Sequence, residues 1–226
     1  MVFSAVIRGN MKEMKSIIAT IIACISFVAC AQTQTNNNNI PKGSTKVPAK
    51  KESIATFAEG CFWHSEIVFQ SLKGVRDAVS GYAGGHSSKP DYDEVSSGKT
   101  GHAESVQVYY DSSVISFEAL VDAFFASQDP TTLNKQGNDV GTEYRSIAFY
   151  RNEKEKEIIN TAIKKLTAAK KYKNKIVTEV VPYVKFYSAE NYHQEYISQH
   201  PENPYVQNVS IPDYLKFKRE FKGNYK

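Results

Sequence analysis

The 226-residue chain contains only three cysteines and one tryptophan. Cys24 and Cys30 lie in the first 30 residues, and no cysteine follows Cys61. This absence excludes a disulfide between Cys61 and any downstream residue. A strong charge of one sign is also missing, since the formal net charge is +4. We therefore expect no nucleic-acid partner, because proteins that bind nucleic acids carry a clustered basic face.

Long apolar runs are absent except near the N-terminus. The charged segment 11–15 precedes a mostly apolar, uncharged run over residues 16–29, and Cys30 follows. This order is typical of a bacterial export signal, and residues 27–30 are similar to a lipobox with Phe in place of the usual Leu. The run falls short of the roughly 18 apolar residues of a membrane-spanning helix. We expect an exported protein of the periplasm or cell envelope, held to the membrane only by a lipid on Cys30 or by an uncleaved signal anchor.

Residues 31–52 are polar and lack aromatic side chains. Such a composition cannot bury enough apolar surface to offset the entropy of the chain, so it predicts a disordered tether. We therefore divide the chain into a signal peptide with lipobox over residues 1–30, a tether over 31–52 and one folded catalytic domain over 53–226.

Apolar periodicity predicts an α+β fold for the folded domain. Strands are expected over residues 53–59, 75–82, 104–110 and 145–151, and helices over 61–73 and 116–127. This β-α-β-β-α-β order is typical of a ferredoxin-like split β-α-β two-layer sandwich, with helices on one face of the sheet. An extra helix over 153–172, an extra strand over 177–187, a short helix over 189–199 and a long irregular C-terminal tail complete the prediction.

Cys61 lies where the first strand turns into the first helix. Unpaired N–H groups at a helix N-terminus lower the pKa of a thiol, so the position predicts a catalytic thiolate. Two long loops, 86–103 and 128–144, are expected to be functional because unstructured loops of this length are uncommon in compact domains. The first loop carries Tyr92 and leads to Glu104, and the second carries Asp139 and Tyr144. The alternative roles are aromatic packing for the tyrosines and loop capping for the carboxylates.

Four segments together resemble peptide methionine sulfoxide reductase A. They are Gly60-Cys61-Phe62-Trp63-x-x-Glu66, Tyr92-x-x-Val95-x-x-Gly98-x-Thr100-Gly101-His102-Ala103-Glu104, Gln136-Gly137-Asn138-Asp139-x-Gly141-x-x-Tyr144-Arg145-Ser146 and His193-Gln194-x-Tyr196. The resemblance implies that Cys61 is the nucleophile. It also implies that Glu104, Tyr92 and Tyr144 donate protons or hydrogen bonds to the sulfoxide oxygen, with Asp139 in support. Phe62 and Trp63 would receive the methyl group of the substrate.

The implied reaction reduces the S epimer of methionine sulfoxide in oxidised proteins, and in free methionine sulfoxide. Attack on sulfur requires that the oxygen gain a proton, so Glu104 must be protonated, and burial near apolar rings would raise its pKa. Cys61 would be left as a sulfenic acid. Because no cysteine follows Cys61, we expect an external thiol to regenerate it, either thioredoxin-like, glutaredoxin-like or small. No bound cofactor or metal is expected, and the protein is expected to be a monomer.

Two other functions remain open from the residues. A cysteine-dependent hydrolase or acyl transferase would need a histidine base, for which His64, three residues along the same helix, is the candidate. A non-catalytic surface lipoprotein could bind oxidised proteins without turnover. His102-x-Glu104 is similar to part of a zinc deaminase signature, but no Pro-Cys-x-x-Cys follows. His64 and Glu143 also stand where the resembled family usually has Gly and Gln.

Overall fold

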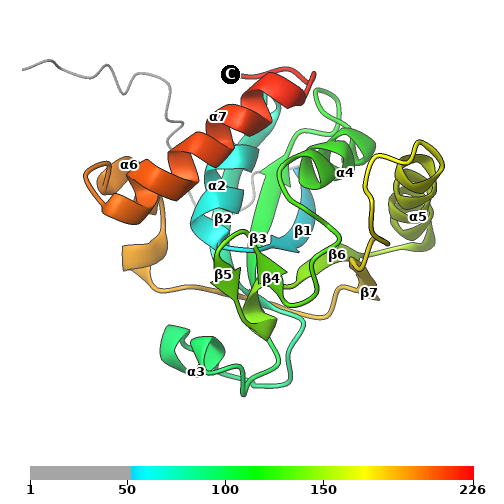
Figure 1. The fold of residues 1–226 in the computed structure, drawn as a ribbon. Helices are drawn as coiled ribbons and strands as arrows, with labels where there is room; N and C mark the ends of the chain where they lie inside the picture. The colour runs from blue at the N-terminus through cyan, green and yellow to red at the C-terminus, as the bar shows by residue number, and fades with distance from the viewer. Residues whose placement is uncertain (1–51) are drawn as a thin grey trace, which may run out of the picture. The chain divides into compact units, whose positions relative to one another are not determined.

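The computed structural model describes residues 52–226, drawn in colour in Figure 1. The predicted signal peptide, the lipobox with Cys30 and all but the last residue of the predicted tether lie outside the described residues. Within residues 52–226, no helix combines the length and the apolar character needed to cross a bilayer.

A four-stranded antiparallel arrangement forms the centre of the domain. Its strands are β1 (Ser53–Glu59), β2 (Val75–Ala83), β3 (Ala103–Tyr110) and β6 (Ser146–Tyr150). Their spatial order is β6-β1-β3-β2. Helix α2 (Phe62–Gln70) connects β1 to β2, and α4 (Phe117–Ala126) connects β3 to β6. This is the ferredoxin-like order that the sequence predicts, and the α+β class is confirmed.

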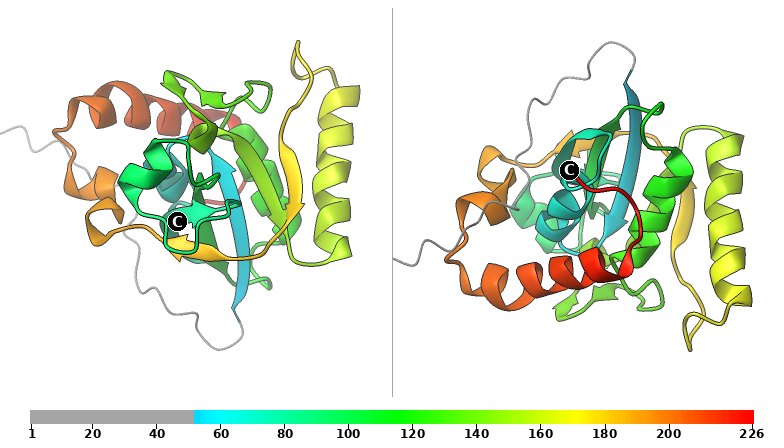
Figure 2. Two further views of the ribbon diagram at one scale, coloured as in Figure 1. Left: turned by 90° about the horizontal axis from the view of Figure 1, so that it is seen from below. Right: turned by 90° about the horizontal axis from the view of Figure 1, so that it is seen from above.

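The main core lies between this sheet and the helices. Phe57 on β1 is fully buried and stacks on three rings, at centroid distances of 5.2 Å to Phe69, 6.1 Å to Phe117 and 5.1 Å to Phe124. The longer helices α2, α4, α5 (Glu153–Ala168) and α7 (Ile211–Glu220) all contribute to this one cluster. Helix α7 packs on α2, and α5 packs beside α4 (Figures 1 and 2).

The predicted strand over residues 177–187 is wrong, because two strands occupy that segment. Strand β7 (Glu179–Pro182) runs parallel to β6, whereas β8 (Phe186–Ser188) is antiparallel to β2 at the opposite edge of the six-stranded sheet. From Pro182 at the end of β7 to Phe186 at the start of β8 the chain advances four residues, which reach at most about 14 Å. In a flat sheet, the two edge strands would lie five strand spacings apart, or about 24 Å. The sheet is therefore curled, which brings its two edges near each other, and a single straight strand could not serve both.

The predicted irregular C-terminal tail is also wrong. After the short turns η2 (Asn191–His193) and α6 (Tyr196–Gln199), the π-helical turn η3 (Val206–Ser210) leads directly into α7. The last residues then return to the end of α2, where Tyr225 pairs with Leu72 and the Lys226 N–H donates to the Ser71 carbonyl at 2.9 Å. The C-terminal segment thus covers α2 instead of leaving it exposed.

Both long loops contain structure of their own. The first holds α3 (Tyr92–Ser96), which is capped by the Asp91 side chain. The second holds a short hairpin of β4 (Lys135–Gln136) and β5 (Asp139–Val140), followed by the 3-10 turn η1 (Thr142–Tyr144). These pieces give the loops a fixed course toward the start of α2.

Candidate active site

Cys61 is the N-cap residue of α2 and is partly exposed. Gly60 before it has a φ of 97°, which favours glycine. A Cβ on Gly60 would lie 2.6 Å from Cβ of Gln136. The chain can therefore turn from strand to helix beneath the β4–β5 hairpin only because residue 60 lacks a side chain.

Glu104 lies on β3 and is 2% exposed. Its Oε2 accepts a hydrogen bond of 3.0 Å from the backbone N–H of Phe62, in the first turn of α2. Burial raises the pKa of Glu104 to about 8, against the opposing effect of this hydrogen bond. The carboxyl group next to Cys61 is thus mostly protonated at neutral pH, as the sequence predicts.

The remaining predicted polar residues gather around the same sulfur. Burial and the nearby Glu104 raise the pKa of both Tyr92 and Tyr144, and Cys61 acts on both tyrosines as well. Asp139 accepts a hydrogen bond of 2.5 Å from the hydroxyl of Tyr205, which also hydrogen-bonds Cys61. The structure therefore brings Tyr92, Tyr144 and Asp139 together with the Cys61–Glu104 pair.

The predicted lowering of the Cys61 pKa is wrong. Burial of the sulfur raises the pKa of Cys61, and the carboxylates of Glu104 and Asp139 add to this. The backbone N–H groups of Trp63 and His64 stabilise the thiolate but only partly offset the cost of removing it from water. The resting nucleophile is a protonated thiol.

Aromatic rings form one wall beside the thiol. Phe62 is 1% exposed and packs near Tyr92, with ring centroids 6.5 Å apart. Trp63 stacks face to face on Tyr196 at 3.7 Å. Its indole N–H donates to Nδ1 of His193 at 3.1 Å, which fixes both the indole plane and the tautomer of the imidazole. Neither Tyr205 nor the positioning contact of His193 was predicted from the sequence.

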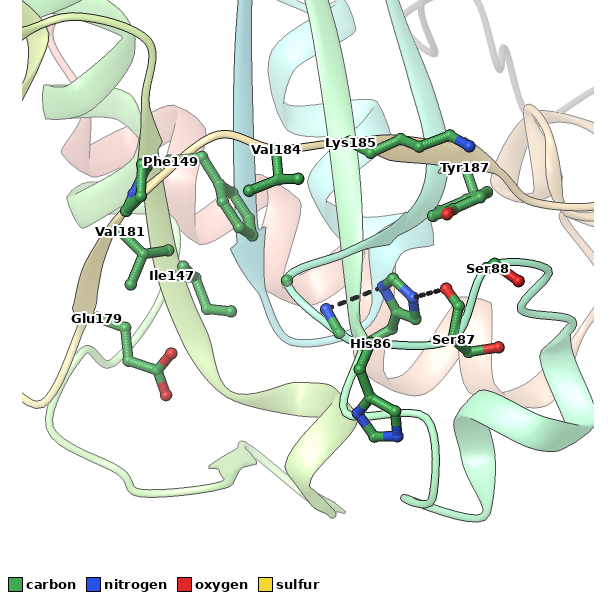
Figure 3. A pocket seen from close by; sticks show the side chains of 14 residues that line it. His86, Ser87, Ser88, Ile147, Phe149, Glu179, Val181, Val184, Lys185 and Tyr187 are labelled. Carbon is green, nitrogen blue, oxygen red and sulfur yellow. Dashed lines mark hydrogen bonds between the residues drawn. The ribbon is translucent and has the colours of Figure 1, made fainter.

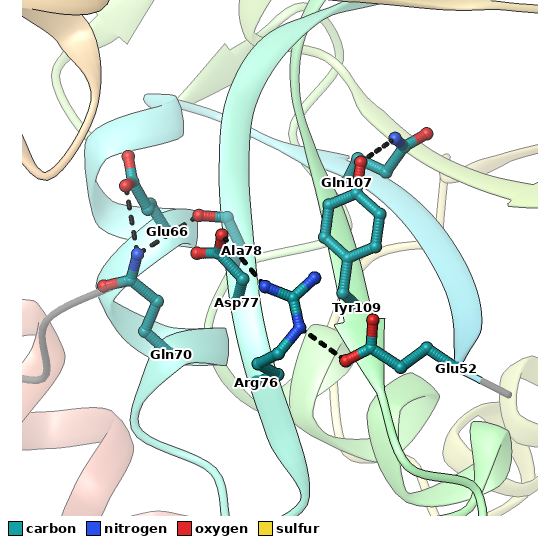
Figure 4. A network of polar contacts seen from close by, with 8 residues as sticks. All are labelled: Glu52, Glu66, Gln70, Arg76, Asp77, Ala78, Gln107 and Tyr109. Carbon is teal, nitrogen blue, oxygen red and sulfur yellow. Dashed lines mark hydrogen bonds and ion pairs between the residues drawn. The ribbon is translucent and has the colours of Figure 1, made fainter. Parts of the chain in front are cut away.

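A polar network holds α2 in place (Figure 4). One carboxylate oxygen of Glu66 accepts from Gln70 at 3.1 Å and from the Glu195 backbone N–H at 2.8 Å, and its other oxygen accepts from Ser80 at 2.5 Å. Gln70 also donates to the carbonyl oxygen of Ala78 at 3.1 Å. The motif residue Glu66 therefore links α2 to β2 and to the segment that carries His193, and so fixes the position of the aromatic wall.

His102 has a structural role instead of a ligand role. Its Nδ1 accepts from the Gly85 N–H at 3.0 Å, and its Nε2 donates to the Ser87 carbonyl at 2.9 Å. Both ring nitrogens are therefore engaged in holding the loop after β2, at a cavity of about 450 Å³ that Cys61 does not line (Figure 3). Across residues 52–226, there is no group of three or more side chains suited to hold a metal ion.

His64 is not placed as a base for the thiol. Its Nε2 lies 3.3 Å from the Ser127 carbonyl oxygen, to which it donates, and its Nδ1 has no hydrogen-bond partner. Burial lowers the pKa of His64. Neither ring nitrogen contacts the Cys61 sulfur through a hydrogen bond, so no Cys–His pair of the hydrolase type is formed.

Comparison with known proteins agrees with this geometry. A family model described as peptide methionine sulfoxide reductase matches residues 53–225. The chain is 49% identical to peptide methionine sulfoxide reductase MsrA of Nautilia profundicola over 171 residues, which are 74% of this chain and 97% of that protein. The corresponding protein of Pasteurella multocida is 48% identical over 172 residues, 76% and 98% of the two chains. The chain belongs to the peptide methionine sulfoxide reductase family.

Solved structures of the family also share the fold. Reduced Mxr1 of Saccharomyces cerevisiae superposes with a TM-score of 0.65 at 34% identity, covering 73% of this chain and 94% of that one. Methionine sulfoxide reductase A of Corynebacterium diphtheriae gives a TM-score of 0.62 at 29% identity, covering 74% and 91%. As a member of this family, the protein is an oxidoreductase that returns methionine sulfoxide in peptides to methionine.

Proposed function

We propose that Cys61 is the nucleophile and Glu104 the general acid of a reductase specific for the S epimer of methionine sulfoxide. The observation that carries this proposal is the buried, largely protonated Glu104 carboxyl group, held on the Phe62 N–H beside the thiol. A protonated acid is what the oxygen of a sulfoxide needs when its sulfur is attacked.

The proposed first half-reaction forms a sulfenic acid. The Cys61 sulfur attacks the substrate sulfur as Glu104 transfers its proton to the sulfoxide oxygen. The thiol proton leaves toward the Tyr205–Asp139 pair, to which the sulfur is already hydrogen-bonded. The oxygen then passes to Cys61, the thioether is released and the cysteine sulfur has been oxidised to –SOH.

The other predicted residues act on binding and on charge in the transition state. Tyr92 and Tyr144 keep their hydroxyl protons because their pKa values are raised, so each can donate a hydrogen bond to the developing oxyanion. Phe62 and Trp63 provide an apolar surface for the substrate methyl group, worth on the order of 1 kcal/mol for one carbon.

We propose that an external thiol regenerates Cys61. No cysteine follows Cys61 in the sequence, so no downstream partner in the same chain can reduce the sulfenic acid. A thioredoxin-like or glutaredoxin-like protein, or a small thiol, would form a mixed disulfide with Cys61 and then release it reduced.

An assay with separate epimers tests the catalytic proposal. The wild-type chain should reduce a peptide with methionine S-sulfoxide in the presence of dithiothreitol and leave the R epimer unchanged. Cys61→Ser should abolish turnover. Turnover that survives in Cys61→Ser would overturn the proposed nucleophile, and hydrolysis of an ester without sulfoxide reduction would favour the hydrolase.

We further propose export to the periplasm or cell envelope, with a lipid on Cys30 as the only membrane attachment and a monomeric catalytic domain. The sequence supports this through the charged segment 11–15, the apolar run 16–29 and the small residue Ala29 before Cys30. Intact-mass measurement of the membrane fraction tests it. A mature chain that begins at a lipidated Cys30 is expected, and one that retains residues 11–29 would contradict it.

A further inference from the structure

A small polar cavity lies behind the start of α2 and is lined by Cys61. It measures about 50 Å³, and its other lining residues include Glu59, His64, Ser127, Ser210 and Asp213. They come from the end of β1, the first turn of α2, the end of α4 and the start of α7. We call this space the Cys61 chamber. Glu104 does not line it.

Three side chains of the chamber each have one polar atom that makes no hydrogen bond of good geometry. Across residues 52–226, seven buried side-chain nitrogen or oxygen atoms lack a hydrogen bond, and three of them belong to residues of this one lining: Glu59 Oε1, His64 Nδ1 and Ser210 Oγ. Buried polar groups without protein partners usually bind ordered water. About 10–15 Å³ is enough for one water molecule, so the chamber has room for several.

Ser127 holds the two titratable residues of the chamber in place. Its hydroxyl donates to Glu59 Oε2 at 2.8 Å, and its carbonyl oxygen accepts from His64 Nε2. Ser65 is a second hydrogen-bonding neighbour of Glu59, and the Ser210 backbone is a second one of His64. Glu59 itself is 1% exposed. Burial raises the pKa of Glu59 to about 8, so this side chain also carries a proton at neutral pH.

We propose that water in the Cys61 chamber carries a proton from Glu59 to the hydroxide that leaves the Cys61 sulfenic acid during regeneration. This inference rests on the proposed sulfenic acid and external thiol. The reductant thiolate forms a bond to the Cys61 sulfur while the S–O bond breaks, and its electron pair leaves with the oxygen. That oxygen takes the proton and departs as water. The reductant sulfur is oxidised, the Cys61 sulfur is reduced, and Glu59 later regains a proton from solvent.

Glu104 has already transferred its proton to the same oxygen in the first half-reaction, so the leaving hydroxide takes its proton from another group. The other titratable groups on the lining are His64 on α2, Asp139 on β5, Tyr205 before η3 and Asp213 on α7. No lysine or arginine is among the described lining residues, so no cation favours ionised Glu59 there. Asp213 raises the pKa of His64, but burial has the larger, opposite effect. Asp139 and Tyr205 take up the thiol proton in the proposed first half-reaction and are the other proton source on the lining, whereas Glu59 is the carboxyl group there that burial already keeps protonated before that reaction.

The test separates the two half-reactions of the full-length chain. Cys24 and Cys30 are changed to Ser in every protein so that Cys61 is the only thiol. Sulfenic acid is first formed with a peptide S-sulfoxide and without any reductant. The oxidised protein is then mixed with 2-nitro-5-thiobenzoate, whose thiol remains ionised from slightly acidic to alkaline pH, and the loss of its absorbance gives the rate of mixed-disulfide formation.

In the wild type, mixed-disulfide formation should slow above about pH 8, where Glu59 loses its proton. Glu59→Gln should slow this step by about tenfold or more and should abolish the alkaline decline. The first half-reaction should keep its wild-type rate. Glu59→Asp should recover part of the second rate, and Glu118→Gln, which changes an exposed carboxylate on α4, should behave as wild type.

An equal loss in both half-reactions would show a structural role for Glu59 and overturn the inference. So would an unchanged second rate, or an alkaline decline that persists in Glu59→Gln. Failure of the wild-type chain to form sulfenic acid from the S epimer would instead refute the proposed function.

Discussion

At the scale of single residues, burial keeps the two reacting groups neutral. The Cys61 thiol and the Glu104 carboxyl group both hold a proton at rest, because each has a pKa raised by removal from water. A neutral pair avoids two adjacent negative charges in a site of low dielectric. Charge then develops only as the substrate sulfur is attacked, when the oxygen can accept the proton.

Glu104→Gln removes the acid but keeps a group of the same shape that can accept from the Phe62 N–H. We expect the rate of Cys61 oxidation by a peptide S-sulfoxide to fall by about 10². In the wild type this rate should decline as pH rises above about 8, because the active form of Glu104 is the protonated one. Single-turnover rates measured against pH check both points, and a variant that keeps the alkaline decline would assign it to another group.

Tyr205→Phe removes the hydroxyl that joins Asp139 to Cys61. The net value of one such hydrogen bond is about 1 kcal/mol, so we expect the first half-reaction to slow by roughly five- to tenfold. Rapid-quench measurement of the thioether product gives the rate. Tyr192→Phe is the matched control, since Tyr192 is 59% exposed. Equal rates for the two variants would contradict a role for Tyr205 at the thiol.

At the scale of secondary structure, the sequence predicts the elements whose signals are local. Strand β1 has the predicted bounds, and Ser116 caps α4 as expected, accepting from the Ala119 N–H at 3.1 Å. The course of the chain over residues 177–188 depends instead on the curl of the whole sheet. No local pattern reports which edge a short strand joins, and so the division into β7 and β8 escaped prediction.

Helix α7 did carry a signal that was missed. Its buried residues Tyr214 and Phe217, with Val206 and Ser210 before them, follow a helical spacing of three or four residues. Lys218 and Arg219 lie in the last turn, where cations are favoured. Tyr205 enters the site only because this helix fixes the segment before it.

Phe217→Ala tests how much α7 contributes to the fold. Phe217 is 1% exposed and stacks on Phe221 at 5.2 Å. Its truncation should lower the free energy of unfolding by about 3–5 kcal/mol, as is usual for a buried phenylalanine. Urea denaturation checks this value. Leu215→Ala on the same helix, at a position 48% exposed, should cost less than about 1 kcal/mol; similar losses for both variants would mean that α7 does not pack as described.

At the scale of the whole molecule, the site exists only where distant segments meet. Its predicted residues come from the start of α2 and from α3, β3, β5 and η1, and their roles were inferred from a resemblance, since spacing alone does not report convergence. The direction in which the Cys61 pKa moves could not be predicted from the helix N-terminus, because it depends on how much protein surrounds the sulfur. The positions of Tyr205 and Glu59 likewise follow from tertiary packing.

The buried carboxyl groups predict a dependence of stability on pH. Burial raises the pKa of Glu59 and Glu104 to about 8 and that of Glu66 to about 7. A raised folded pKa means that the native state binds the proton more tightly than the unfolded chain does. This stabilisation is complete below the unfolded pKa of 4.5 and is lost as pH rises through 7 and 8.

The melting temperature should therefore fall between about pH 5 and about pH 9. Each tenfold difference in proton affinity between the folded and the unfolded chain corresponds to about 1.4 kcal/mol of stability. Thermal unfolding followed by circular dichroism measures the fall. Glu66→Gln, which keeps a hydrogen-bonding side chain at a site away from the thiol, should make this fall in melting temperature shallower. A melting temperature that rises over this interval would contradict the protonated state of these side chains.

The position of β1 also determines how the enzyme can be attached to a support. The described chain enters β1 at Ser53, and Cys61 follows its last residue, Glu59, at the opposite end. A strand of that length measures roughly 24 Å. Immobilisation through a residue just ahead of Ser53 should therefore leave the catalytic sulfur open to large folded clients. A linker fused after Lys226 would likewise start at the end of α2 that is opposite to Cys61.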